Sequence, residues 1–281
     1  MTSGGTDRLM DNERMNTGSS IGKPLRIHWF RRGGGKAAGN FGDELGPLVV
    51  SHILQRPVEW AEPENCDLAS IGSILSQVSK AANRVNRSSE LMVWGSGLME
   101  EDIDRLHGCI NPLAVRGVNT RRALGLRDDL PLGDPGILSD LLIEPQEKKH
   151  IWGVVPHFSH RNSPKIREVI RDNNCLLIDP TSPVLDVLKA ISSCRGIVSS
   201  SLHGLIVADS FRVPCYWLDI KSHKSHEYKF ADYSSGFDRN IFPRLELDEI
   251  GSLVSGEPDI SPFIVSDSNK TALVNALKAA F

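Results

Sequence analysis

The sequence predicts an α/β protein built from two Rossmann-like domains that face each other across a cleft. Short β-branched and apolar runs alternate with stretches of helical spacing, which implies βαβ units and parallel sheets. A polar connection at 144–150 divides this alternation into two series. Several predicted strands end in polar or glycine-rich turns, and ligands of such sheets bind beyond the carboxyl ends of the strands.

Length and composition fit this class of protein. The chain has 281 residues, 40% hydrophobic and 24% charged, which allows two domains with a sizeable core. A net charge of -3 lacks the basic excess of nucleic-acid-binding proteins, so no nucleic-acid partner is expected. Five scattered cysteines without a C-x-x-C pair argue against a disulfide framework and against a zinc site. Reduced thiols in a cytoplasmic protein are the expectation.

Residues 1–23 are polar and lack the apolar centre of a signal peptide, so they are expected to form a disordered leader. The sequence contains no apolar run of about 18 residues, so no transmembrane helix is predicted.

The N-terminal domain is expected at 24–146. Its predicted strands are 25–30, 58–60, 68–71, 91–94 and 113–116, and its clearest helices are 43–54 and 119–126. The peptide G-D-P-G at 133–136 is a turn by its chemistry.

The C-terminal domain is expected at 147–281. Strands at 151–155, 176–178, 197–199 and 215–218 alternate with helices at 163–172, 184–192 and 202–212. A last helix at 269–281 has one apolar face, and we expect it to pack back on the N-terminal domain.

The strand-to-helix turn at 199–204, S-S-S-L-H-G, is the strongest candidate site. A serine there would cap a helix whose N–H groups and dipole attract an anion. His203 lies in the first helical turn, and Gly204 would admit a close ligand or backbone. A capped helix with a satisfied histidine is common in structural roles, so the turn alone leaves function open.

Four other turns are expected at the same edges of the two sheets. They are Asn40–Asp43, Gly95–Gly97, Arg116 with Gly117, and Pro156 with His157. Five such turns together favour a binding site in the cleft.

Familiar catalytic motifs are absent or incomplete. Glu100 replaces the third glycine of a dinucleotide fingerprint that Gly95 would begin, and no G-x-S-x-G elbow occurs. Gly35-Lys36 lacks the rest of a phosphate loop. His157 and His160 lack a third metal ligand, so no metal is expected. The basic stretch 221–229 fits either a solvated loop or a lid over the cleft.

The chain resembles the polysaccharide pyruvyl transferases, and among them the xanthan-type and succinoglycan-type ketal pyruvate transferases. The resemblance covers about residues 25–240. Its motifs are N-F-G-D-E-L (40–45), I-G-S-I-L (71–75), V-W-G-S-G (93–97), A-V-R-G (114–117), G-D-P-G (133–136), V-P-H-F (155–158), S-S-S-L-H-G-L-I (199–206) and K-F-A-D-Y (229–233). Some members carry arginine where this chain has Ser201, so an anion contact is expected from Arg116 or a backbone N–H instead.

The resemblance implies a GT-B-like fold and a reaction without a cofactor. Pyruvate from phosphoenolpyruvate would be joined to two hydroxyls of a sugar in an exopolysaccharide repeat unit as a ketal, with release of phosphate. The oligosaccharide acceptor would be lipid-linked, which implies a cytoplasmic enzyme in peripheral contact with the inner face of the membrane. Two alternatives stay open: a GT-B glycosyltransferase that uses a nucleotide sugar, and a non-catalytic glycan-binding module.

The residues suit this chemistry as follows. His203 would donate a proton, Asp43 would accept one, and Arg116 would hold the donor's anionic groups. Further donor contacts are expected from His157, Ser199, Ser200, Ser201, Leu202 and Gly204. Acceptor contacts are expected from Asn40, Gly42, Asp43, Gly95, Ser96, Gly97 and Lys229.

Overall fold

The computed structural model describes residues 23–31, 39–220 and 227–281. Within these ranges the N-terminal half forms a five-stranded sheet from β1 (Leu25–His28), β2 (Val58–Trp60), β3 (Leu68–Ser70), β4 (Leu91–Trp94) and β5 (Ile110–Ala114). The strand order is β2-β1-β3-β4-β5, and all the pairings are parallel. The helical elements of this half are α1 (Phe41–Leu54), α2 (Leu75–Arg84), α3 (Val118–Ala123) and the 3-10 helix η1 (Pro135–Leu141).

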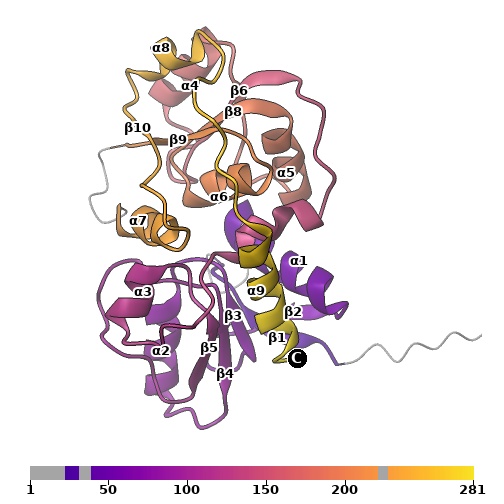
Figure 1. The fold of residues 1–281 in the computed structure, drawn as a ribbon, viewed down its shortest axis with the longest axis vertical. Helices are drawn as coiled ribbons and strands as arrows, with labels where there is room; N and C mark the ends of the chain where they lie inside the picture. Colours follow the sequence, from indigo (N-terminus) through magenta and orange to yellow (C-terminus); the bar gives the residue numbers. More distant parts are fainter. Residues whose placement is uncertain (1–22, 32–38, 221–226) are drawn as a thin grey trace, which may run out of the picture.

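The C-terminal half repeats this plan in the described residues. Its strands are β6 (His150–Val155), β7 (Leu176–Leu177), β8 (Cys194–Ser199), β9 (Cys215–Leu218) and β10 (Arg244–Leu245). They pair in parallel in the order β10-β9-β8-β6-β7. Its helices are α4 (Pro164–Asp172), α5 (Val184–Ser192), α6 (Leu202–Ser210), α7 (Glu227–Ser235), α8 (Ile250–Val254) and α9 (Asp267–Lys278). The two parallel α/β halves confirm the predicted Rossmann-like, GT-B-like architecture (Figure 1).

A shared core joins the two halves. The buried side chains of α1, η1 and α6 belong to one hydrophobic cluster that includes Leu45, Ile137 and Ile206. Gly136 of η1 lies so close to α6 that a Cβ there would be 2.9 Å from Ile206 Cγ2. This packing fixes the start of α6 relative to the N-terminal sheet, which matters because α6 carries His203.

Two C-terminal helices lie against the N-terminal half (Figure 1). In α9, Leu273 is fully buried, and its carbonyl accepts a 2.9 Å hydrogen bond from Trp94 Nε1 of β4. In α7, Ser235 Oγ accepts a 3.0 Å bond from the backbone N–H of Val118 at the start of α3. Helices α7 and α9 therefore connect the two halves at two places.

The structure corrects some element boundaries. The basic stretch 221–229 is not simply a loop: 221–226 lie outside the described residues, and α7 begins at Glu227. The polar sequence of α7 hid its buried face, which includes Lys229, Phe230 and Asp232. Strand β5 begins at Ile110 and ends at Ala114, so Arg116 lies two residues beyond it. The predicted leader, apart from Lys23, also lies outside the described residues.

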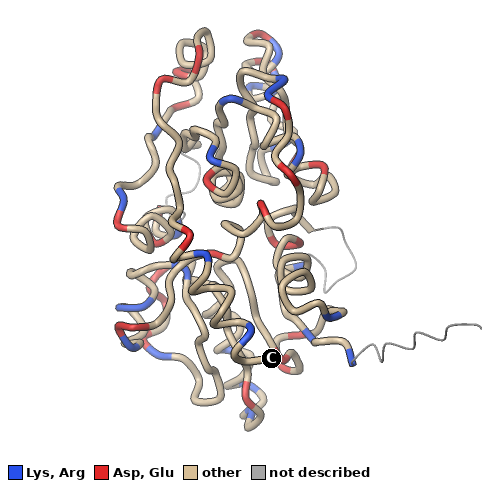
Figure 2. Tube along the Cα trace, turned by 45° about the vertical axis from the view of Figure 1, so that its right-hand side comes forward, with Lys and Arg blue, Asp and Glu red and all other residues tan. Residues whose placement is uncertain are grey.

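Acidic and basic residues are interspersed on both halves (Figure 2). In the part of the chain that the structure describes, no helix is long and apolar enough to cross a bilayer.

Candidate active site

A cavity of about 350 Å³ lies between the two halves. Its volume is within the range of small-molecule sites, about 300–1,000 Å³. Four chemically active side chains line it: Asp43 from α1, Arg116 after β5, His203 from α6 and Lys229 from α7. The other lining residues are Phe30, Asn40, Gly72, Ser73, Ile74, Gln77, Met99, His157, Phe158, Pro180, Ser201 and Leu202. The structure thus brings together all three residues that the sequence predicted as catalytic.

Asp43 is held in the first turn of α1 by a helix cap. The Asn40 side-chain carbonyl accepts from the backbone N–H groups of Gly42 at 3.0 Å and Asp43 at 3.4 Å, and its amide donates to the Asp43 carboxylate. Only 8% of Asp43 is exposed. Burial raises the pKa of Asp43 to about 7, against the opposing effects of the Asn40 hydrogen bond and the Lys229 charge. A carboxyl with this pKa can donate or accept a proton near neutral pH.

His203 lies in the first turn of α6, as the sequence predicted. Its ring packs so closely on Gly42 that a Cβ at that position would be 2.0 Å from Nδ1. Burial lowers the pKa of His203 to about 3, and the positive charges of Lys229, Arg116 and His157 lower it further. His203 is therefore a neutral imidazole, whereas the sequence led us to expect that it would donate a proton.

Arg116 is in the cavity wall, but most of its guanidinium is already engaged. Nε donates to Asp232 Oδ2 at 2.9 Å, Nη2 donates to the carbonyl of Leu98 at 2.5 Å, and Nη1 donates to Ser73 Oγ at 2.6 Å. Both charged partners are fully buried. The neighbouring Gly117 leaves room for α7, because a Cβ there would be 1.7 Å from the Asp232 carbonyl oxygen. The fork expected for a bidentate donor contact is therefore used inside the protein.

Lys229 supplies the cation that Arg116 does not present. It is 8% exposed and, among the described residues, its ammonium forms no ion pair. Burial lowers the pKa of Lys229 to about 8, with Arg116 acting in the same direction and Asp43 against it. Nζ lies 5.4 Å from the ring of Phe230, which stacks on Trp217 at 4.3 Å.

The Gly95–Gly97 turn does not line this cavity, so its acceptor contacts stay a prediction that the cavity does not support. Gly95 has φ +75°, and a Cβ there would be 2.1 Å from Pro135 Cδ. A Cβ at Gly97 would be 2.5 Å from Arg116 Cζ. Ser96 donates to the Gly72 carbonyl at 2.8 Å. The turn instead makes room for η1 and for the Arg116 side chain. Gly42, also predicted to contact the acceptor, leaves the space that the His203 ring occupies.

The serine turn divides into packing and site residues. Ser199 Oγ donates to the carbonyl of Val155 at 2.9 Å, and a Cβ at Gly204 would be 2.3 Å from that hydroxyl. Ser201 begins α6 without a side-chain cap bond. Ser201 and Leu202 line the main cavity, while Ser199 and Gly204 hold the turn in shape.

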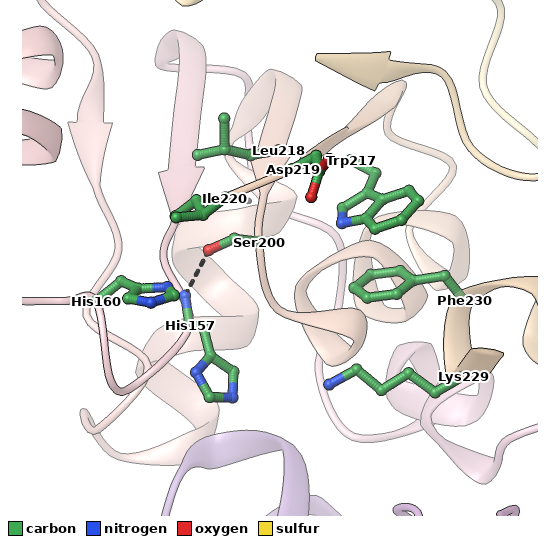
Figure 3. A pocket seen from close by; sticks show the side chains of 9 residues that line it. All are labelled: His157, His160, Ser200, Trp217, Leu218, Asp219, Ile220, Lys229 and Phe230. Carbon is green, nitrogen blue, oxygen red and sulfur yellow. Dashed lines mark hydrogen bonds between the residues drawn. The ribbon is translucent and has the colours of Figure 1, made fainter. Parts of the chain in front are cut away.

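A second, smaller cavity of about 30 Å³ adjoins the first at His157 and Lys229 (Figure 3). Ser200 Oγ lies in its wall and accepts a 2.7 Å hydrogen bond from the His157 backbone N–H (Figure 3). Space for a water or two is all that this volume provides. Ser200 therefore positions the His157 loop at the edge of the site.

Two acidic residues near the site were not predicted. Asp232 anchors Arg116, and Asp134 Oδ2 lies 3.8 Å from His203 Nε2. Asp134 belongs to the G-D-P-G peptide, which the sequence predicted only as a turn. Because this peptide is also one of the motifs shared with the pyruvyl transferases, it could have indicated a site residue. Across the described ranges, no group of three or more His, Cys, Asp or Glu side chains is arranged to hold a metal ion.

Two facing parallel α/β halves with a polar cavity between them define a GT-B-like class of protein. The chain belongs to the polysaccharide pyruvyl transferase family, whose model matches residues 29–222. It is therefore an enzyme of the pyruvyltransferase class.

The individual proteins to which this chain is similar have low sequence identity to it. An uncharacterized protein of Acanthamoeba polyphaga mimivirus is 27% identical over 228 residues, covering 76% of this chain and 75% of that protein. The succinoglycan biosynthesis protein ExoV of Rhizobium meliloti is 29% identical over 214 residues, covering 73% of this chain and 64% of ExoV. Among solved structures, the ADP-heptose LPS heptosyltransferase II of E. coli matches 92% of this chain and 98% of its own, at 11% identity and a TM-score of 0.34.

Proposed function

We propose that this enzyme transfers pyruvate from phosphoenolpyruvate to two hydroxyls of one sugar in an exopolysaccharide repeat unit, forming a ketal and releasing phosphate. The observation that carries the proposal is the grouping of Lys229, Asp43 and His203 in one cavity beside the start of α6. The family supports pyruvyl transfer, and the name of ExoV supports an exopolysaccharide acceptor.

Lys229 and the start of α6 bind the donor in this proposal. Phosphoenolpyruvate carries a phosphate and a carboxylate, which favour a buried ammonium and the N–H groups of a helix N-terminus. Ser201 leaves those N–H groups without a side-chain cap. A bound anion raises the pKa of Lys229 and keeps its ammonium charged. Arg116 contributes its positive charge from the wall of the cavity. Its hydrogen bonds to Ser73 and Leu98 hold the N-terminal side of the cavity in place.

The reaction requires a group that gives a proton and one that takes a proton. C3 of the donor gains a proton while the first sugar oxygen bonds to C2. Phosphate then leaves C2, and the second sugar oxygen takes its place. Of the two hydroxyl protons released, one balances the proton gained by C3 and the other leaves with phosphate.

Near neutral pH His203 carries no extra proton, because its pKa is about 3, whereas Asp43, with a pKa of about 7, can hold one. We infer that Asp43 protonates C3 and that His203 takes the first hydroxyl proton. This reverses the roles that the sequence suggested. The reason is burial, which favours the neutral form of each group.

The acceptor lies on the N-terminal side of the cavity in this proposal. Phe30 and Met99 line it there and are 39% and 37% exposed, so they offer apolar contact to a sugar ring. Asn40 and Gln77 offer polar contacts to hydroxyls. We extend the proposal to a lipid-linked acceptor, met by peripheral contact with the cytoplasmic face of the membrane. No cofactor is required.

The test uses phosphoenolpyruvate labelled with ¹³C at C2 and pyruvate-free oligosaccharide repeat units of succinoglycan. We expect equal amounts of phosphate and of glycan carrying a labelled ketal carbon. Phosphate release without label in the glycan, or no stabilisation of the protein by phosphoenolpyruvate in a thermal-shift assay, would contradict the proposal.

A further inference from the structure

Two buried polar atoms face each other behind the cavity. His203 Nε2 and Asp134 Oδ2 are 3.8 Å apart, and neither has a hydrogen-bond partner among the described residues. Buried polar atoms almost always have a partner, so two such exceptions side by side require an explanation. We propose that Asp134 is a positioning residue, which holds His203 with its proton on Nε2 and leaves Nδ1 for the substrate.

The carboxylate of Asp134 is fixed in orientation by its own turn. Oδ1 accepts a 2.8 Å hydrogen bond from the N–H of Gly136, which leaves Oδ2 as the oxygen that faces the imidazole. The turn cannot relax easily: Gly133 has φ +140°, and Pro135 is seated in the space left by the missing side chain of Gly95. Asp134 itself is fully buried. The carboxylate therefore has one rigid orientation toward α6.

The imidazole is held from the opposite side. Gly42 of α1, which has no side chain, packs beside Nδ1, Cγ and Cβ of His203, and the His203 side chain is 12% exposed. Nε2, but not Nδ1, is among the buried polar atoms without a partner in the described residues. The distance of 3.8 Å between Nε2 and Oδ2 is longer than a hydrogen bond. Catalytic hydrogen bonds are often long in an empty site and tighten when substrate binds. A shift of the ring by about 1 Å would close this one.

The surrounding charges determine which nitrogen of the His203 ring carries its proton. The charged groups that act on His203 are Lys229, Arg116 and His157, and those that act on Asp134 are Arg116, Asp232 and Asp43. Burial and these cations keep His203 neutral, so its ring carries one proton. Burial raises the pKa of Asp134 to about 6, which leaves it ionised at pH 7 and above. An ionised carboxylate at Nε2 favours the tautomer with the proton on that nitrogen.

The catalytic role of a proton on His203 Nε2 rests on the proposed function. With the proton on Nε2, the lone pair of Nδ1 accepts the proton of the attacking hydroxyl. The charge that develops on the ring is then stabilised by Asp134, in the same way that a buried aspartate supports the histidine of a serine-protease triad.

The tautomer of His203 tests the pairing without any substrate. We would label the full chain with ¹⁵N-histidine, identify the His203 signals by their loss in His203→Gln, and record long-range ¹H–¹⁵N spectra at pH 7.5. The wild type should show the Nε2–H form. Asp134→Asn should move the proton to Nδ1, because the amide now donates to Nε2, and should lower kcat about 10²–10⁴-fold. A KM for phosphoenolpyruvate close to that of the wild type is expected.

Asp179→Asn is the matched control, since Asp179 also caps a turn, accepting from the N–H of Thr181 at 2.8 Å. It should leave both the His203 tautomer and kcat unchanged. A wild-type spectrum with the Nδ1–H form would overturn the proposal even if Asp134→Asn does not fold. An unchanged tautomer in folded Asp134→Asn would overturn it as well. The expected tautomers without pyruvyl transfer would support the pairing and count against the proposed reaction instead.

Discussion

Replacing Gly42 with alanine should disable the site through one methyl group. Alanine is the better helix former by about 0.5–1 kcal/mol, so α1 itself gains from the change. The new Cβ, however, would lie 2.0 Å from His203 Nδ1 and 2.5 Å from His203 Cβ. Favourable contacts between such atoms are about 3.5–4.0 Å, so the ring and the start of α6 must move by more than about 1 Å.

A displacement of about 1 Å at a catalytic group can reduce the rate about 10²-fold. We therefore expect kcat/KM for phosphoenolpyruvate to fall by that factor in Gly42→Ala, with a destabilisation of about 1–3 kcal/mol from overpacking. Gly46→Ala, one turn further along α1, is the control. Its Cβ would meet Ile71 Cβ at 3.5 Å, an ordinary contact, so kcat/KM should not change. A folded Gly42→Ala enzyme with wild-type kcat/KM would refute the placement of His203 at the reaction centre.

Three further substitutions test the other charged groups. Lys229→Met should weaken phosphoenolpyruvate binding about 10–100-fold in calorimetry, and wild-type affinity should fall as pH rises through about 8, the pKa of the Lys229 ammonium; equal affinity at pH 7 and pH 9 would contradict this. Asp43→Asn should lower kcat about 10²–10⁴-fold. Its folded pKa, about 7, exceeds the unfolded value of 3.8, so Asp43 destabilises the fold progressively as pH rises from about 4 to about 7, and fully above that; the variant should gain in Tm at pH 8 and much less at pH 4. Asp232→Asn leaves the buried Arg116 charge unpaired and should cost about 3–5 kcal/mol in urea unfolding; an unchanged midpoint would show that the pair is not needed.

Local sequence patterns were sufficient for much of the fold. Residues 58–60, 91–94, 184–192 and 215–218 form the predicted elements with the predicted bounds. Their apolar runs are short and bounded, as buried parallel strands and the helices between them require. The assignment failed in α7, because the stretch 221–229 was expected to be a solvated loop or a lid, whereas Lys229 and Asp232 lie on a buried helix face. Helix propensity contains no information on contacts between distant residues, such as that of Asp232 with Arg116, which lies 116 residues away in the sequence.

The candidate site was predicted in outline and revised in detail. Strand ends did bring Asp43, Arg116 and His203 to one cavity, because parallel strands present their carboxyl ends at one edge. Glycines were harder to interpret, since a glycine that admits a ligand and one that admits a neighbouring proline look alike in sequence. Gly95 is of the second kind. The protonation states of Asp43 and His203 depend on burial, which local sequence does not specify.

Turnover in D₂O tests the central claim, that a protein-bound acid protonates C3 of phosphoenolpyruvate while its C2 is transferred to a glycan. The enzyme would be incubated with phosphoenolpyruvate and the pyruvate-free oligosaccharide in D₂O, and the product glycan examined by mass spectrometry and NMR. The account predicts a ketal whose methyl group carries one deuterium, formed together with one phosphate. A modified glycan without deuterium in that methyl group, or a glycan that retains the phosphate, would contradict it.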